Sequence, residues 1–225
     1  MFGIFLFLTY YLQQTLHYSP VVTGVAFLPL IAMVVVAANL SNVVLLPRVG
    51  PKLLVAGGML LAAGSMVWLT RIGLHSGYAA AVLGPLMVAG LGLGFTIAPS
   101  MNTGTFGVAP QDAGVASATL NTGQQVGGSI GTALLNTIFA SAVARYLTSH
   151  LSPATVVHGH PAASLTAMSL IHGYTIAFWV AAAIFGAGAV ICGALLRFGP
   201  LRAPGDAEAV PAEAVAPEAV TAHAA

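Results

Sequence analysis

Polar side chains that could bind a small molecule recur along one apolar stretch of the sequence. They are Asn121, Gln125, Ser129, Thr132 and Asn136. At about 100° per residue, these five positions fall on one face of a helix about 80° wide. Amides and hydroxyls cost free energy in hydrocarbon unless they meet protein or water. The face therefore indicates either a wet cavity or hydrogen bonds to neighbouring helices, and the sequence leaves both interpretations open.

A second polar cluster lies near the end of the first apolar stretch. Its members are Tyr10, Tyr11, Gln13 and Gln14. Such a cluster is typical of the end of a membrane helix at the lipid–water interface, and it is equally compatible with a cavity wall. From the two clusters we select four residues as the predicted substrate cavity, and these are Tyr11, Gln13, Asn121 and Gln125.

Glycines form two further patterns at helical spacing. Gly123, Gly127 and Gly131 recur every four residues on a face separate from the amides, which predicts close helix packing. Gly90 and Gly94 are also interpreted as a packing face, because no strand precedes them as a dinucleotide-binding loop would require.

Enzyme chemistry finds little support in the sequence. Asp112 is the only carboxylate outside the last twenty residues, and it belongs to a connection between helices. No Ser-His-Asp set can therefore be assembled, and no acid lies within a predicted membrane helix. His158 and His160 could approach a metal, but their segment offers no carboxylate or cysteine, and a plain solvated loop is the simpler interpretation. We predict no enzyme activity, no metal site and no cofactor.

Composition indicates the class of protein. Apolar residues make up 58% of the chain and charged residues only 5%, against about a quarter charged in soluble domains. A net charge of +1 gives no basic surface for nucleic acid. The chain is therefore expected in a lipid bilayer, which takes about 20 helical residues to cross.

Six apolar segments predict an all-α membrane protein of about six transmembrane helices. They cover residues 2–16, 21–46, 53–71, 78–106, 113–146 and 173–196. We expect residues 1–197 to form the helical bundle, with an external loop at about 148–172. The Ala-, Glu- and Pro-rich residues 198–225 are expected to be a disordered cytoplasmic tail.

Orientation follows from the bases in the connections. One side of the six-helix arrangement carries Arg48, Lys52, Arg197 and Arg202, and the other carries Arg71 and Arg145. The excess of bases on the cytoplasmic side places the C-terminus in the cytoplasm.

Several runs together resemble the C-terminal half of the 14-helix drug:proton antiporters of the major facilitator superfamily. The early runs are YLQ at 11–13, YSP at 18–20, FLP at 27–29 and RVGPK at 48–52. The later runs are 90–99, DAGVAS at 112–117 and NTGQQVGGSIG at 121–131. Arg48, Gly50 and Lys52 match the superfamily's cytoplasmic loop motif, whereas Pro47 stands where that motif has an Asp.

The resemblance implies half of a major facilitator fold, built as two inverted three-helix repeats, in a bacterial cell membrane. It implies part of a proton-coupled permease that exports amphipathic or lipophilic small molecules. The family's proton-coupling carboxylates lie in its N-terminal half, so a separate N-terminal six-helix half or self-association is expected. The alternative is a truncated, non-transporting remnant or an assembly subunit of such a transporter.

Overall fold

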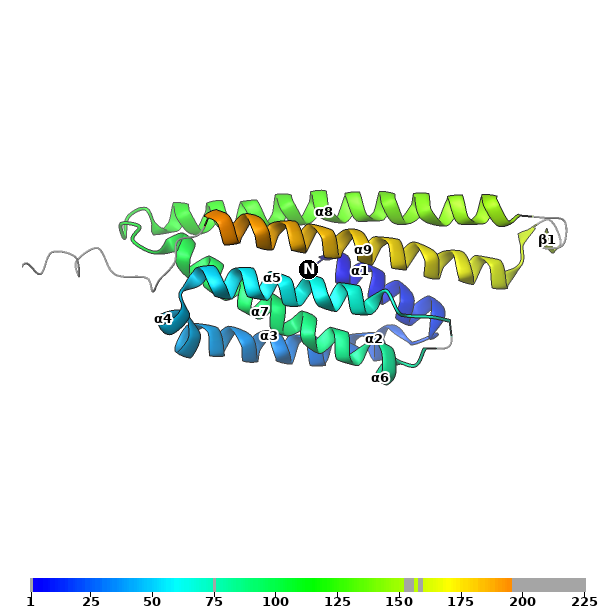
Figure 1. The fold of residues 1–225 in the computed structure, drawn as a ribbon, viewed down its shortest axis with the longest axis horizontal. Coiled ribbons are helices and arrows are strands. Elements are labelled where there is room, and N and C mark those ends of the chain that lie inside the picture. The colour runs from blue at the N-terminus through cyan, green and yellow to red at the C-terminus, as the bar shows by residue number, and fades with distance from the viewer. Residues whose placement is uncertain (1, 75, 152–155, 158–159, 196–225) are drawn as a thin grey trace, which may run out of the picture.

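The chain folds into a bundle of roughly aligned helices (Figure 1). The computed structural model describes residues 2–74, 76–151, 156–157 and 160–195. The elements, in order, are α1 (Phe2–Tyr10), the π-helical turn η1 (Tyr11–Thr15), α2 (Pro20–Ala26), α3 (Leu28–Leu40), the π-helical turn η2 (Ser41–Leu45), α4 (Leu46–Val49), α5 (Pro51–Leu69), α6 (Tyr78–Ala81), α7 (Leu83–Thr105), α8 (Ala113–His150), β1 (Val156–Val157), β2 (His160–Pro161) and α9 (Ala163–Leu195).

Five helical stretches within these residues are long and apolar enough to cross a membrane. They are Pro20–Val49, Pro51–Leu69, Leu83–Thr105, Ala113–His150 and Ala163–Leu195. The first predicted segment is also helical, but α1 has 9 residues and η1 has 5, which is short of a full crossing. The prediction of an all-α integral membrane protein is confirmed, with the first helix shorter than the other five.

The connection between the last two helices is shorter than the sequence suggested. α8 continues to His150 and α9 already begins at Ala163, so the predicted loop at 148–172 shrinks to residues 151–162. Within it, β1 and β2 pair antiparallel. α9 starts early because Leu165 and Ser169 are buried against the bundle. The predicted tail at 198–225 lies outside the described residues.

Two prolines explain the short breaks in the helical rods. α2 gives way to α3 at Phe27, just before Pro29, and α6 gives way to α7 at Val82, just before Pro85. Proline has no N–H to donate, and its ring clashes with the carbonyl four residues earlier. The breaks therefore follow from the sequence, while each rod remains long enough to span the bilayer.

Glycines allow α7 to pack closely against two neighbours. A Cβ on Gly92 would lie 2.6 Å from the backbone nitrogen of Ala62 in α5, and one on Gly94 would lie 2.5 Å from the Cβ of Ala37 in α3. A Cβ on Gly90 would collide with the backbone of Leu30. The predicted packing role of Gly90 and Gly94 is confirmed, and α7 forms the centre of this half of the bundle.

Aromatic rings attach the short first helix to α8 and α9. Phe7 lies 5.4 Å from Phe139 and 6.4 Å from Phe178, measured between ring centroids. Tyr174 stacks on Phe139 at 5.1 Å and meets Tyr11 edge-on at 6.1 Å. These contacts fix α1 beside α8, whose only buried residue is Leu135.

Candidate functional site

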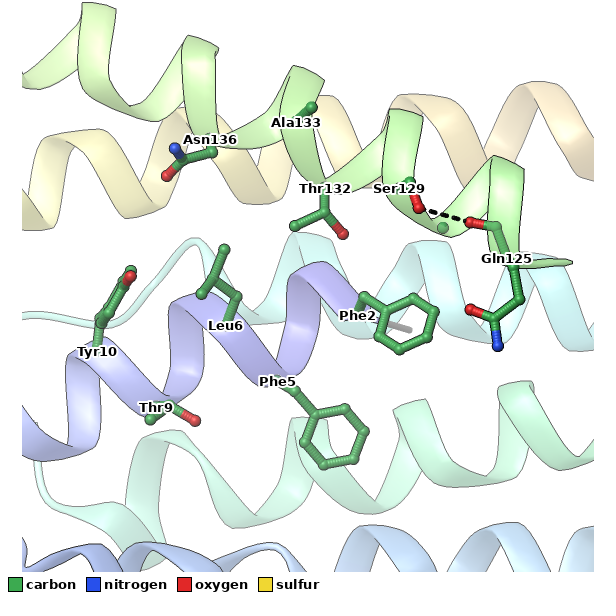
Figure 2. Close-up of a pocket in the computed structure, with 11 residues that line it drawn as sticks. Phe2, Phe5, Leu6, Thr9, Tyr10, Gln125, Ser129, Thr132, Ala133 and Asn136 are labelled. Carbon is green, nitrogen blue, oxygen red and sulfur yellow. Dashed lines mark hydrogen bonds between the residues drawn. The ribbon is translucent and has the colours of Figure 1, made fainter.

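A cavity of about 860 Å³ lies between α1 and α8 (Figure 2). From α1 it is lined by Phe2, Phe5, Leu6, Thr9 and Tyr10, and from α8 by Gln125, Gly128, Ser129, Thr132, Ala133 and Asn136. The polar face of α8 turns toward a largely aromatic and aliphatic face of α1. An apolar wall opposite a few polar groups is the usual composition of a small-molecule site.

The two side-chain amides that α8 contributes to the cavity remain available to a ligand, whereas one hydroxyl is used within the helix. Ser129 donates its hydroxyl to the carbonyl oxygen of Gln125 at 2.8 Å. Within the described part of the chain, the side-chain amides of Gln125 and Asn136 make no hydrogen bond, and both residues are exposed. This arrangement favours the cavity interpretation of the amide face over hydrogen bonds to neighbouring helices.

Three of the four selected cavity residues are placed elsewhere by the structure. Gln125 lines the cavity, whereas Asn121 lies one helical turn before it and does not. Tyr11 is fully buried and donates its hydroxyl to the backbone carbonyl oxygens of Gly73, at 2.9 Å, and Ser76, at 3.2 Å. Tyr11 thus has a structural role in this bundle and does not line the α1–α8 cavity, so its expected role toward a substrate stays a prediction.

Tyr10 takes the place in the cavity wall that was expected for Tyr11. The two rings point in different directions because consecutive helical residues are rotated by about 100°. Gln13, the fourth selected residue, is half-buried in η1 and is absent from the cavity wall. The residues that the selection missed are Ser129, Thr132 and Asn136, and their shared face with Gln125 was the signal that could have found them.

The glycine stripe of α8 does not pack within this chain. A Cβ added to Gly123, Gly127 or Gly131 would meet nothing within 4 Å. The close contact with α1 falls instead at Gly128, where a Cβ would lie 2.6 Å from the ring of Phe2. The predicted packing at the stripe is thus not an internal contact, and the stripe leaves a smooth open face on α8.

The loop motif lies where α4 meets α5 (Figure 1), and none of its three residues lines the cavity. Gly50 has φ 79° and ψ 166°, a conformation that glycine alone adopts without strain. Arg48 sits in the last turn of α4, and Lys52 follows in the first turn of α5. The glycine of the motif thus serves a sharp reversal between two helices.

Metal ligands do not converge in the described residues, which contain no group of three or more His, Cys, Asp or Glu side chains. His158 lies outside the described residues, so the expectation of no metal site stays a prediction.

Comparison with known proteins gives several relatives, although no family model matches the chain. The chain is 44% identical over 199 residues to the puromycin resistance protein of Streptomyces alboniger, which covers 87% of this chain and 38% of that protein. It is 36% identical to the cephamycin export protein of Amycolatopsis lactamdurans, over 61% of this chain and 28% of that protein.

An uncharacterised MFS-type transporter of Mycobacterium tuberculosis, EfpA, is 28% identical over 88% of this chain and 36% of its own length. The chain thus spans well under half the length of the relatives that it matches. The chain is homologous to part of bacterial drug-resistance and export proteins, and the resemblance to drug efflux transporters of the major facilitator superfamily is confirmed.

Proposed function

We propose that the chain forms part of a proton-coupled permease that exports small amphipathic or lipophilic molecules. The observation that carries the proposal is the cavity between α1 and α8, whose wall combines side-chain amides of α8 with aromatic rings of α1. Names of relatives support it, since one confers puromycin resistance and another exports cephamycin. Both names denote handling of antibiotics, which are small molecules of mixed polarity.

The cavity suits such substrates by its chemistry. The rings of Phe2 and Phe5 offer apolar area, and the amides of Gln125 and Asn136 offer two donors and one acceptor each. Among the described residues, no charged side chain lines it, so shape and partial polarity rather than charge select the ligand. A site of this kind accepts a class of compounds and not one molecule.

A companion six-helix half is part of the proposal. The glycine stripe of α8 is open, and a smooth helix face lets another helix approach closely. Asp112, at the N-cap of α8, is the only carboxylate among the described residues, so a proton-coupling acid within the membrane would come from the companion. A separate N-terminal half or a second copy of this chain can supply that surface.

The cell membrane is the proposed location, with the C-terminus in the cytoplasm. The four-to-two distribution of bases between the two sides supports this orientation.

Transport assays in proteoliposomes test the proposal. Puromycin uptake driven by an imposed pH gradient is compared for this chain alone, for this chain with the N-terminal part of the puromycin resistance relative, and for empty vesicles. We expect gradient-dependent uptake only with the companion. Uptake by the chain alone would indicate self-association, and no uptake in either preparation would overturn the proposal in favour of a non-transporting remnant.

A further inference from the structure

A second cavity, of about 740 Å³, lies between α8 and α9 and shares no lining residue with the α1–α8 cavity. It is found toward the end of the bundle where the short β1–β2 connection joins the two helices (Figure 1). Arg145, His150 and His172 are among the residues that line it. Thr137, more than three turns before His150 in α8, also lines it, so the cavity extends about 20 Å along the helix.

An aromatic stack brings the two histidines of this cavity together. The ring of Tyr146 stacks on His150, with centroids 4.2 Å apart and planes at 19°. The same ring lies 4.9 Å from His172 on α9. His150 is held further by its Nδ1, which lies 2.9 Å from the carbonyl oxygen of Tyr146. Two helices thus bring both imidazoles into the wall of the cavity that Arg145 also lines.

No carboxylate neutralises this group within the described part of the chain. Asp112 is the only acid there, and it stands at the opposite end of α8, about 50 Å away along the helix. A guanidinium forms paired hydrogen bonds with phosphate oxygens, and bases at the end of a membrane helix attract anionic headgroups. Among the described residues, the charge of Arg145 therefore has no anion, and one from outside this part of the chain can pair with it.

The rest of the cavity wall offers few free hydrogen-bonding groups to a ligand. The hydroxyl of Ser141 donates to the carbonyl oxygen of Thr137 at 2.8 Å, and that of Thr137 donates to Ala133 at 2.9 Å. Both hydroxyl protons are thus used within α8. Ile138 and Ile176 complete this part of the wall from the two helices. The cavity combines a cationic part with an apolar part, which matches a molecule that has an anionic head and a hydrocarbon chain.

We propose that the α8–α9 cavity binds an anionic phospholipid. The headgroup phosphate lies against Arg145 and the two histidines, and an acyl chain follows Ile138 and Ile176. The site differs from the α1–α8 cavity, which carries no charged side chain. Phospholipid is favoured over free phosphate because the apolar wall would stay exposed beside a small ion.

Lipid binding to the purified full-length chain tests the proposal. Native mass spectrometry from a neutral detergent measures the affinity for dioleoyl phosphatidylglycerol and for dioleoyl phosphatidylcholine. We expect the anionic lipid to bind at least about fivefold more tightly, since one base near a lipid phosphate contributes roughly that factor. Raising the salt concentration reduces the preference because it screens exposed charges.

Three variants make the test specific. Arg145→Gln abolishes the preference, Arg145→Lys keeps most of it, and Arg71→Gln leaves it unchanged. Arg71 is the matched control, since it follows α5 at the same end of the bundle and does not line the cavity (Figure 1). Circular dichroism checks that each variant keeps its helices, and His172→Gln gives a second, independent loss if Arg145→Gln misfolds.

Three outcomes would overturn the proposal. Equal binding of the two lipids would show that the bases do not select an anion. Equal losses in Arg145→Gln and Arg71→Gln would show a general surface effect. Displacement of phosphatidylglycerol by an equal concentration of inorganic phosphate would show a site for a free anion and not for a lipid.

Discussion

The phenol of Tyr11 donates a hydrogen bond of 2.9 Å to the backbone carbonyl of Gly73, 62 residues further along the chain. The bond joins the end of the short first helix to the connection that follows α5. Tyr11 is fully buried, whereas its neighbour Tyr10 is exposed in the α1–α8 cavity. Two adjacent tyrosines thus divide a structural role and a ligand-facing role between them.

Replacing Tyr11 by Phe is expected to lower stability and to spare the cavity. The change removes the hydroxyl bonded to Gly73 and Ser76, which costs about 1 kcal/mol. Thermal unfolding in detergent measures the loss. Tyr10→Phe is the matched control and should unfold at the wild-type temperature. A Tyr10→Phe loss as large as that of Tyr11→Phe would contradict the division of roles.

Gly92→Ala is expected to destabilise the bundle by about 1–3 kcal/mol, the usual range for overpacking. The added methyl would lie 2.6 Å from both the backbone nitrogen of Ala62 and the carbonyl oxygen of Gly58, so α5 and α7 must separate. Gly123→Ala is the control, because nothing lies within 4 Å of its Cβ position. Alanine is the better helix former, so this control should be as stable as the wild type or more stable.

Gly50→Ala is expected to cost about 1–3 kcal/mol through backbone strain alone. The φ of 79° and ψ of 166° at this residue suit glycine, and no side-chain contact need be lost. Gly57→Ala, inside α5 with open space around its Cβ position, provides the comparison. Equal unfolding temperatures for the two variants would show that the α4–α5 reversal does not depend on Gly50.

Much of the fold could be predicted from the sequence because hydrocarbon imposes simple requirements. Segments so apolar must be helical in lipid, and this requirement alone predicted the long helices of the bundle. Their ends were less predictable. The early start of α9 depends on burial of Leu165 and Ser169 by other helices, and a single sequence carries no signal for that contact.

The candidate site was predictable to the level of a helix face. The helical repeat of 3.6 residues per turn placed Gln125 and Asn136 on one side of α8, and in the structure both line the cavity. Which tyrosine of the first helix joins them depends on how that helix is rotated about its axis. That rotation follows from packing of rings such as Phe7 against α8 and α9, which the sequence does not reveal.

The two asparagines of α8 offer the sharpest test of the candidate site. Asn136 lines the cavity with a free side-chain amide, whereas Asn121 is exposed on the same helix and lies outside the cavity wall. Asn136→Ala should raise the Kd for a bound substrate such as puromycin by about fivefold, since one hydrogen bond contributes about 1 kcal/mol. Asn121→Ala should leave the Kd unchanged.

The comparison is made by equilibrium binding to the chain with its proposed companion half. Both substitutions remove the same amide from an exposed position of one helix, so effects on helix propensity and charge cancel. A difference between the variants therefore reports on the position of the amide relative to the ligand. A larger loss for Asn121→Ala would place the substrate nearer the start of α8. The two residues are about 22 Å apart along the helix, which is about four turns, so the two positions are clearly distinguished.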